Sequence, residues 1–537
     1  MLPPHATFTR RSELSAVASG EGVATPNRPI ADKGLKANAL GFVSNLVIGT
    51  ASVAPAYSLA ATLGFVAAVS GIGVHSPGVM IAAFVPMLLI ATAYRYLNRA
   101  DPDCGTTFAW TTRAMGPQVG WINGWAIFLA DVIVMASLAD VAATYTYQLF
   151  DWHYGETHTW VIIVGAVVWI ALMTWICYRG IELSARLQQI LLGYEVLVLM
   201  IFAGVALGTV YLHHPAQSIT VKPEWLNPVG GGFSPMVDGV LLAVFIYWGW
   251  DSGVAVNEET KDRRNGPGIA AMISTVLLVL IYVIVSSAAQ AYHGVGFLTA
   301  NSSDVLTPLG SSVLGKVGYR FLIVAILASA SASTQTTILP TARTTLSMAR
   351  WGAIPAAFGR LHPRFRTPTL STLAMGGISI VWTVLLLGLN PSGNVLGDAI
   401  TALGFTIAFY YGFTGIACVV YFRRMLTRSV KDFLLIGVAP LVGALMLFGI
   451  FGKAFHDYSK SGVNYSHPIL GIQTPIFVGI GGLLLGVVLM FVAFPFQRDF
   501  FRRKPELPGP DGYAIGSTIA PDEPGYAPAA PLQLDVT

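Results

Sequence analysis

An acidic side chain lies inside a stretch of this chain that is otherwise strongly apolar. Asp251 stands between Gly249 and Gly253 in FIYWGWDSGVAVNEETKDRR, within an apolar run that begins near Met236. A charge in hydrocarbon is costly, and every backbone amide there needs a partner. An acid flanked by glycines therefore predicts a cavity, a ligand or an ion at this position.

The composition indicates the environment of this acid. Of the 537 residues, 11% are charged and 54% are hydrophobic, whereas a soluble domain has roughly 25% charged residues. With about 20 apolar residues for each crossing, the sequence predicts twelve membrane helices and thus an all-α, multi-pass membrane protein in the lipid bilayer. The predicted helices are 39–69, 78–96, 120–149, 159–178, 187–210, 236–256, 268–291, 321–339, 370–389, 398–421, 433–451 and 474–496.

The positive charges predict the orientation. With both termini in the cytoplasm, 26 of the 31 Lys and Arg residues fall on the cytoplasmic side, as the positive-inside rule requires. We expect a protein of the cell membrane. The net charge of +4 reflects this topology and does not call for a nucleic-acid partner. The five exceptions are Lys222, Lys316, Arg320, Lys453 and Lys460.

The first predicted helix carries an interruption of its own. In NLVIGTASVAPAYS, Gly49 and the small residues Thr50, Ala51 and Ser52 precede Pro55. Proline removes one amide donor and obstructs the carbonyl four residues earlier, which leaves backbone groups free for a ligand. Helices one and six are corresponding members of two five-helix halves, and paired interruptions at such positions are typical of the midplane binding site of a transporter.

Several motifs then resemble one family. FIYWGWDSGVAVNEETKDRRNGPG is similar to the aromatic, glycine and acid pattern, ending in a Glu-Glu pair, of the amino acid, polyamine and organocation (APC) transporters. PDCGTTFAWTTRAMGPQVGWINGW resembles the family's link between helices two and three, and RGIELSARLQQILLGYE its entry to helix five. TARTTLSMARWGAIPAAFGRLHPRFRTPTLS resembles the cytoplasmic helix that follows helix eight. The resemblance runs from about residue 40 to residue 421, although helix one lacks the Gly-x-Gly break of many members.

The resemblance implies a fold and a mechanism. The fold is a LeuT-type 5+5 inverted repeat, with discontinuous helices one and six and two extra helices, which works by alternating access. The chain would then divide into a disordered cytoplasmic tail (1–35), a ten-helix transport core (36–430), helices 11 and 12 (431–497) and a largely disordered cytoplasmic tail (498–537).

The substrate site is expected at the two interruptions. A substrate carboxylate would bind free amides at the start of the half-helix after Gly49, where the helix dipole favours an anion. An ammonium group would face carbonyls near Phe245 to Trp248 and the carboxylate of Asp251. Phe245 resembles the family's aromatic gate; packing or contact with lipid is the alternative. The predicted substrate residues are Gly49, Thr50, Ala51, Ser52, Asp131, Phe245, Trp248, Gly249, Asp251 and Tyr410.

Glu195 is the candidate for ion coupling. Many relatives carry a lysine nine residues after the Arg of the helix-five entry sequence, and here that position is Glu195. Desolvation favours the protonated form of a buried carboxylate, so this residue could load and release a proton during the cycle. Sodium stays open as the coupling ion, because Ser331, Ser333 and Thr334 could supply oxygen ligands. A structural hydrogen bond is the alternative for Glu195.

Glu258 and Glu259 are candidates for an inner gate, since they follow helix six where it reaches the cytoplasm. As a gate they would pair with Arg113, or with Arg343 and Arg350; solvated interfacial charge is the alternative.

The function expected is secondary active transport of amino acids or related amines, with proton coupling. A putrescine-type importer and an amino acid exchanger of the same fold are the alternatives within this class. A channel would need a pore-lining ring or filter motif, and an enzyme would need a nucleophile and base or a metal set; neither pattern appears. The three cysteines have no metal-ligand spacing, and no cofactor is expected.

Overall fold

The computed structural model describes residues 33–302, 304–389, 395–460 and 468–508. Over these ranges the fold is helical, and its only β-structure is three isolated bridges. Eleven helices are long and apolar enough to cross a membrane, and one bent pair, Phe233–Ala243 with Phe245–Ala255, makes a twelfth span. The prediction of an all-α, multi-pass membrane protein with about twelve spans is confirmed.

The helices follow the predicted order with extensions at several ends. They are α1 (Phe42–Ser52), α2 (Pro55–Ala68), η1 (Gly73–His75), α3 (Ser76–Ala100), α4 (Thr107–Met115), α5 (Pro117–Leu149), α6 (His153–Thr157), α7 (Thr159–Arg179), α8 (Ile181–His213), η2 (Pro223–Leu226), α9 (Phe233–Ala243), η3 (Phe245–Tyr247), α10 (Ser252–Ala255), η4 (Asn257–Glu259), α11 (Gly266–Ala300), α12 (Leu306–Arg350), η5 (Ala356–Gly359), α13 (Thr369–Leu389), α14 (Val395–Tyr421), α15 (Val430–Asp432), η6 (Phe433–Val438), α16 (Ala439–Tyr458), α17 (Thr474–Ala493) and α18 (Arg498–Phe501).

The first span is broken at Val53 and Ala54. Helix α1 ends at Ser52, and Ala54 has the left-handed backbone φ of 52°. Pro55 then opens α2 as its first residue, a position where the missing proline N–H costs nothing. The left-handed alanine is a strained conformation, so packing around the break must hold it in place.

The sixth span is broken over a longer stretch. Helix α9 ends at Ala243, the turn η3 follows, Trp248 is extended, and α10 resumes only at Ser252. Gly249 has a φ of 115°, which L-residues rarely adopt. The predicted interruption at WGWDSG is therefore present.

The eighth span and the span that contains Pro440 differ in detail from the expected segments. The cytoplasmic helix expected after helix eight is the continuation of α12 itself, which runs 45 residues with one non-helical position at Gly315. The turn before Pro440 is π-helical, η6. A proline cannot donate its amide to the preceding turn, and a wider turn is one way to accommodate it.

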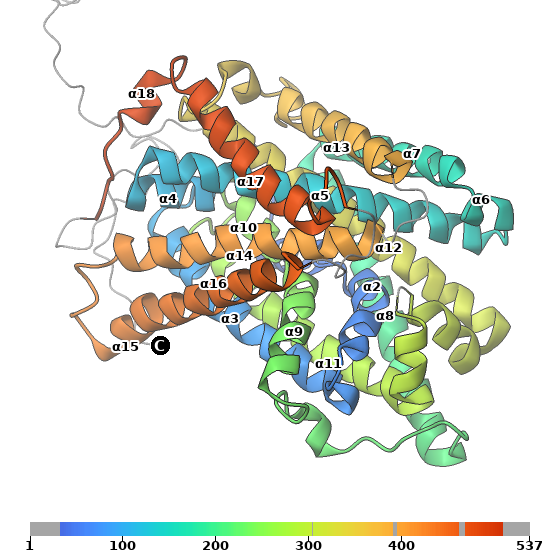
Figure 1. The fold of residues 1–537 in the computed structure, drawn as a ribbon. Helices are drawn as coiled ribbons and strands as arrows, with labels where there is room; N and C mark the ends of the chain where they lie inside the picture. Colours follow the sequence, from blue (N-terminus) through green and yellow to red (C-terminus); the bar gives the residue numbers. More distant parts are fainter. Residues whose placement is uncertain (1–32, 303, 390–394, 461–467, 509–537) are drawn as a thin grey trace, which may run out of the picture.

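Helices α4, α15 and α18 lie at one end of the bundle, and α6 lies at the opposite end (Figure 1). We call the first the α4 end; the distribution of positive charge predicts that it faces the cytoplasm. Most of the two predicted tails, residues 1–32 and 509–537, lies outside the described residues. The described parts at the inner edges of the tails are packed: Lys33 and Leu35 are buried, as are Phe500 and Phe501.

Replacing Gly249 by alanine tests the contact between the breaks. A Cβ at this position would lie 2.8 Å from Ser52 Oγ and 3.0 Å from the Ser52 carbonyl oxygen, and the backbone strain alone costs about 1–3 kcal/mol. We expect Gly249→Ala to lower the melting temperature of the purified protein. Gly193→Ala is the control, because a Cβ there meets nothing within 4 Å. Equal melting temperatures for the two variants would contradict the packing described here.

Candidate functional site

The two breaks meet in close contact inside the bundle. A Cβ added to Gly253 would lie 2.6 Å from the carbonyl oxygen of Asn45, so α10 packs directly on the backbone of α1. The hydroxyl oxygens of Ser52 and Ser252 are 2.8 Å apart. The polar backbone groups at the break of one span therefore lie beside those at the break of the other span.

The predicted residues of the first break divide into two groups. Gly49 faces the backbone of Trp250, 2.9 Å from the position of a Cβ. Thr50 donates its hydroxyl to the carbonyl of Leu46 at 2.9 Å, and Ala51 is fully buried. These three residues serve the packing of α1, whereas Ser52 lies at the break itself.

Asp251 lies in a cage of tyrosine hydroxyls. Tyr411 donates to Oδ1 at 2.8 Å, and Tyr410 and Tyr94 donate to Oδ2 at 3.3 and 3.4 Å. Within the described ranges no lysine, arginine or histidine forms an ion pair with Asp251. Hydroxyl donors stabilise the carboxylate without neutralising it, so the cage offers a negative charge to a cationic group.

Aromatic rings surround this cage. The indole of Trp250 stacks on Tyr411 with ring centroids 5.2 Å apart, and it meets Tyr94 edge-on at 4.9 Å. The indole N–H of Trp248 donates to the hydroxyl of Tyr410. Electron-rich ring faces attract cations, so the rings add to the attraction of the carboxylate for a cationic group.

Phe245 lies on the side of the break nearer to α2. It is 4% exposed and packs edge-on against Tyr57, with ring centroids 6.3 Å apart. The hydroxyl of Tyr57 is 3.0 Å from Ser137 Oγ. This aromatic pair therefore joins both broken spans to α5.

Asp131 is a second buried acid on α5. It is 3% exposed and accepts a hydrogen bond from the hydroxyl of Thr341 on α12. It belongs to the contact between two long helices, and among the described residues its hydrogen-bond partner is Thr341, not a tyrosine of the cage around Asp251.

Glu195 reaches the first turn of α2 from α8. Its Oε1 accepts the Ala56 amide at 2.6 Å and the Ser329 hydroxyl at 2.7 Å. Ser329 Oγ in turn accepts the Tyr57 amide at 3.2 Å. Glu195 is fully buried, and its Oε2 has no hydrogen-bond partner among the described residues. One carboxylate oxygen thus holds a half-helix, and the other is free.

This arrangement corrects the expectation of free amides at the start of that half-helix. Pro55 has no N–H, Ala56 donates to Glu195, and Tyr57 donates to Ser329. The Ser58 amide reaches the carbonyl of Ala54 at 2.8 Å. The acceptors come from α8 and α12, so the sequence around the break could not reveal them.

The hydroxyls considered as sodium ligands have other partners. Ser331 donates to Leu327 O and Thr334 to Ala330 O within α12, at 2.7 and 2.8 Å. Ser333 donates to the carbonyl of Ser52 at 2.7 Å and so ties α12 to the end of α1. In this conformation each of the three hydroxyls bonds to a backbone carbonyl.

Glu258 belongs to a buried ionic cluster at the α4 end. The ammonium group of Lys33 contacts Glu258 and lies 2.9 Å from Asp103 Oδ1, and the Cys104 amide donates to Glu258 at 2.9 Å. Burial by itself raises the pKa of Asp103, because it disfavours the charged carboxylate. The ammonium group of Lys33 and the hydrogen bonds from Ser347 and the Gly105 amide outweigh this effect and lower the pKa of Asp103 to about 2. Burial likewise opposes the charge of Lys33, but Asp103, Cys104 and Glu258 hold its pKa well above the usual value.

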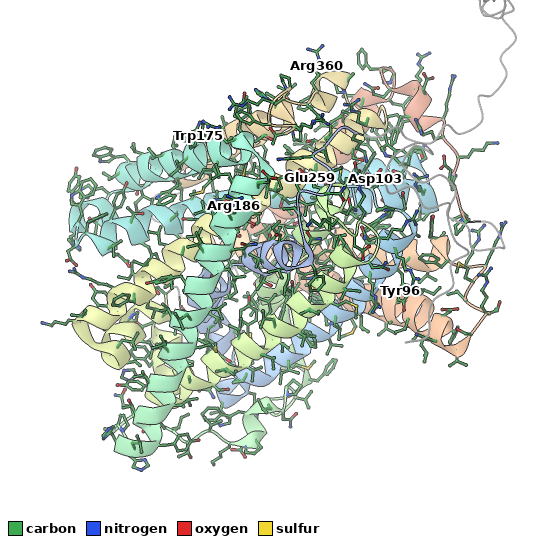
Figure 2. All side chains as sticks on the ribbon, turned by 180° about the vertical axis from the view of Figure 1, so that it is seen from behind. Tyr96, Asp103, Trp175, Arg186, Glu259 and Arg360 are labelled. Atoms are coloured by element: carbon green, nitrogen blue, oxygen red, sulfur yellow. The ribbon has the colours of Figure 1, made fainter. Side chains whose placement is uncertain are left out.

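Glu259 pairs with Arg343 in a two-pronged ion pair. The two N···O distances are 2.6 and 2.9 Å, and both side chains are 1% exposed. Arg343 is one of the partners predicted from the sequence. Arg113 instead pairs with Asp101 at 2.6 Å, and Arg350 donates to the Lys33 carbonyl at 3.4 Å. Figure 2 shows Glu259 and Asp103 near each other inside the bundle, with Arg360 at its periphery.

Sequence reasoning missed several members of the site, among them Tyr94, Tyr411, Ser329, Lys33, Asp103 and Trp250. Tyr411 adjoins the predicted Tyr410, so the FYYGF pattern carried a signal. Lys33 lay in a segment assigned to the tail, and Tyr94 and Ser329 are inconspicuous polar residues in apolar helices. Only the packing of distant helices identifies them.

The sequence of this chain is similar to those of known membrane permeases. The family model described as "Amino acid permease" matches residues 37–494. The low-affinity putrescine importer PlaP of Escherichia coli (strain K12) is 23% identical over 377 residues, 69% of this chain and 79% of the relative. The branched-chain amino acid permease BcaP of Lactococcus lactis is 25% identical over 438 residues, 77% and 86% of the two chains. The arginine/ornithine antiporter of Latilactobacillus sakei is 22% identical over 337 residues, 61% and 69% of the two chains.

The family match covers most of the chain, including both broken spans, the tyrosine cage and the ion pair between Glu259 and Arg343; Lys33, the partner of Glu258, lies just before it. It agrees with the family resemblance expected from the sequence motifs and with a transporter as opposed to an enzyme. The chain belongs to the amino acid permease family.

Proposed function

We propose that this permease moves a small substrate with an ammonium group, an amino acid or a related amine, across the cell membrane by alternating access at its two broken spans. The observation that carries the proposal is the carboxylate of Asp251, held by three tyrosine hydroxyls at the break of the sixth span. An anion without a cationic partner inside a membrane helix bundle marks a substrate or ion pathway.

The named relatives support an ammonium group as the shared feature. Putrescine, branched-chain amino acids, arginine and ornithine appear in their descriptions, and each of these compounds carries a primary ammonium group. They differ in the carboxylate, which putrescine lacks.

A putrescine-type amine is the second candidate, and one observation favours it. Glu195 and Ser329 already accept the Ala56 and Tyr57 amides at the start of α2, where an amino acid's carboxylate was expected to bind. A further carboxylate would also meet the negative charge of Glu195 whenever that residue is deprotonated. A substrate without a carboxylate avoids both conflicts.

For coupling we propose a proton carried by Glu195. Its free Oε2 is buried and can accept the proton, while Oε1 keeps its bonds to the amide of Ala56 and the hydroxyl of Ser329. Protonation would remove the attraction between the carboxylate and the positive end of α2 and so loosen the half-helix. Sodium is the alternative, with Ser331 and Ser333 as ligands after rearrangement.

We assign the inner gate to Glu258 and Glu259 and the outer gate to Phe245. The two acids tie the end of the sixth span to Lys33 and Arg343, and such buried pairs must separate before a path opens at the α4 end. Phe245 with Tyr57 covers the opposite side of the break.

Uptake into liposomes tests the function. Purified protein is reconstituted, and labelled putrescine, ornithine, arginine and leucine are offered under an inward proton gradient and, separately, an inward sodium gradient. We expect at least one of these labelled compounds to accumulate inside the liposomes under the proton gradient. Putrescine and ornithine form a matched pair that differs by one carboxylate, so preferential uptake of putrescine would support the second candidate. No accumulation of any compound under either gradient would count against the proposal.

Glu195→Gln tests coupling. Glutamine keeps an oxygen acceptor for Ala56 but cannot titrate, so we expect concentrative, pH-dependent uptake to disappear while substrate exchange across the membrane persists. Glu182→Gln on the same helix is the control, because Glu182 is 50% exposed and pairs only with Lys36 in the described structure. If Glu195→Gln followed the wild-type pH profile, the coupling role would be wrong.

Asp251→Asn tests the cation site. Losing a charged hydrogen-bond partner costs about 1.5–3 kcal/mol, which corresponds to a rise in KM of roughly 10- to 100-fold. Tyr411→Phe removes one donor and keeps the charge, so its KM should rise less. Measured KM values in the reverse order, or an unchanged KM for Asp251→Asn, would exclude Asp251 as the ammonium site.

A further inference from the structure

After the last membrane span, the chain stays packed against the helix bundle. Helix α18 follows α17, and its residues Phe500 and Phe501 are buried. Phe500 stacks on Phe108 of α4 with ring centroids 5.9 Å apart. Residues 502–508, which we call the C-terminal strap, continue from this anchor across the α4 end.

Glu506 supplies the polar contacts between the strap and α4, and next to it Leu507 packs against the hydrophobic core and Pro508 is buried. The backbone amide of Glu506 donates to the Arg113 carbonyl at 2.7 Å, and its carboxylate lies 2.6 Å from Arg113 Nη1. The side chains of Arg113 and Glu506 are only 4% and 10% exposed. Shielding from water strengthens such a charged hydrogen bond.

A tryptophan connects the strap to the gate. The guanidinium groups of Arg113 and Arg503 both lie over the ring of Trp351, at 4.9 and 5.3 Å from its centroid. The indole N–H of Trp351 donates to Asp103 Oδ2 at 3.1 Å. Asp103 is the acid that holds Lys33 beside Glu258, so the strap lies two contacts away from the ionic cluster of the gate.

The pair between Arg113 and Glu506 can open without leaving a buried cation alone. Arg113 is also paired with Asp101 at 2.6 Å, which remains when Glu506 departs. Breaking a buried pair is expensive chiefly because of the uncompensated charge left behind. The strap contact therefore has the properties of a reversible fastening, unlike the pair of Glu259 with Arg343, in which each side chain is the other's only ionic partner among the described residues.

We propose that the C-terminal strap is a latch on the inner gate, with Glu506 as its anchoring residue. Docked, it holds Arg113 and Trp351 in the positions that support Asp103 and the ion pairs around it. Undocked, it lets the α4 end open more often. The inference rests on the gate proposed for Glu258 and Glu259, and it adds a control element that the substrate site does not contain.

Alkylation of Cys104 measures the latch directly. Cys104 is fully buried within the gate cluster, where its amide bonds to Glu258, so a maleimide reaches its thiol only when the cluster opens. The full-length protein carrying Cys177→Ala and Cys418→Ala is labelled in detergent without substrate, and mass spectrometry follows the rate. Denatured protein gives the value for complete labelling.

We expect Glu506→Gln, and separately a chain truncated after Phe501, to be labelled roughly 10-fold faster than the parent or more, as for the loss of a shielded hydrogen bond between charged groups, which is worth about 1.5–3 kcal/mol. Lys504→Ala is the matched control, since Lys504 is an exposed residue of the same strap, and it should be labelled at the parent rate. Parent rates for both Glu506→Gln and the truncation would overturn the latch. Equal acceleration by Lys504→Ala would also overturn it, because general loosening would then explain the effect.

This experiment separates the latch from the transport proposal. Labelling needs neither substrate nor gradient, so a wrong substrate or coupling ion leaves the latch result intact. Conversely, a failed latch leaves the uptake, Glu195 and Asp251 experiments unaffected.

Discussion

The constraint on which the structure depends is the need to satisfy backbone polar groups in hydrocarbon. Two membrane spans are interrupted, and an interrupted helix leaves amides and carbonyls without partners. Each break is placed against the other, with Gly253 on the backbone of Asn45 and Ser52 beside Ser252. Neighbouring helices supply the remaining partners: Glu195 and Ser329 accept amides of α2, and Ser333 donates to Ser52. Polar side chains therefore gather around the two breaks, because the backbone groups there lack partners within their own helices.

The four acids of the two sites differ in the chemistry of their partners. Glu258 and Glu259 have cations, Lys33 and Arg343, and form closed ion pairs at the α4 end. Asp251 has hydroxyls, and Glu195 has an amide and a hydroxyl. Glu259 has a cation of its own and Glu258 shares Lys33 with Asp103, whereas Asp251 and Glu195 have only neutral donors and can still respond to a cation or a proton. This division follows from partner type, since all four side chains are acids within the same helix bundle.

The sequence allowed the spans, the two interruptions and the position of Asp251 at the sixth break to be predicted, because apolar length, proline, glycine and charge are local signals. The position of the first break was less accessible: α1 stays helical through Gly49 and the three small residues after it, and it ends only where Ala54 precedes Pro55. Partners contributed by distant elements could not be read at all. Tyr94, Ser329 and Lys33 belong to the site because segments far apart in the sequence pack together. For Glu258 the sequence predicted an arginine partner, whereas the structure places Lys33 beside it.

The two proposed gates differ in what their opening would require. The ring contact between Phe245 and Tyr57 can separate with no charge exposed. The contacts at the α4 end are buried ion pairs, and separating them in a dry environment leaves charges without compensation. Opening that end must therefore admit water to Glu258, Glu259, Lys33 and Arg343 as they part. A gate of this kind is stable until several contacts yield together, which is why a supporting contact that keeps its own cation paired, as Arg113 does with Asp101, is suited to adjust how often it opens.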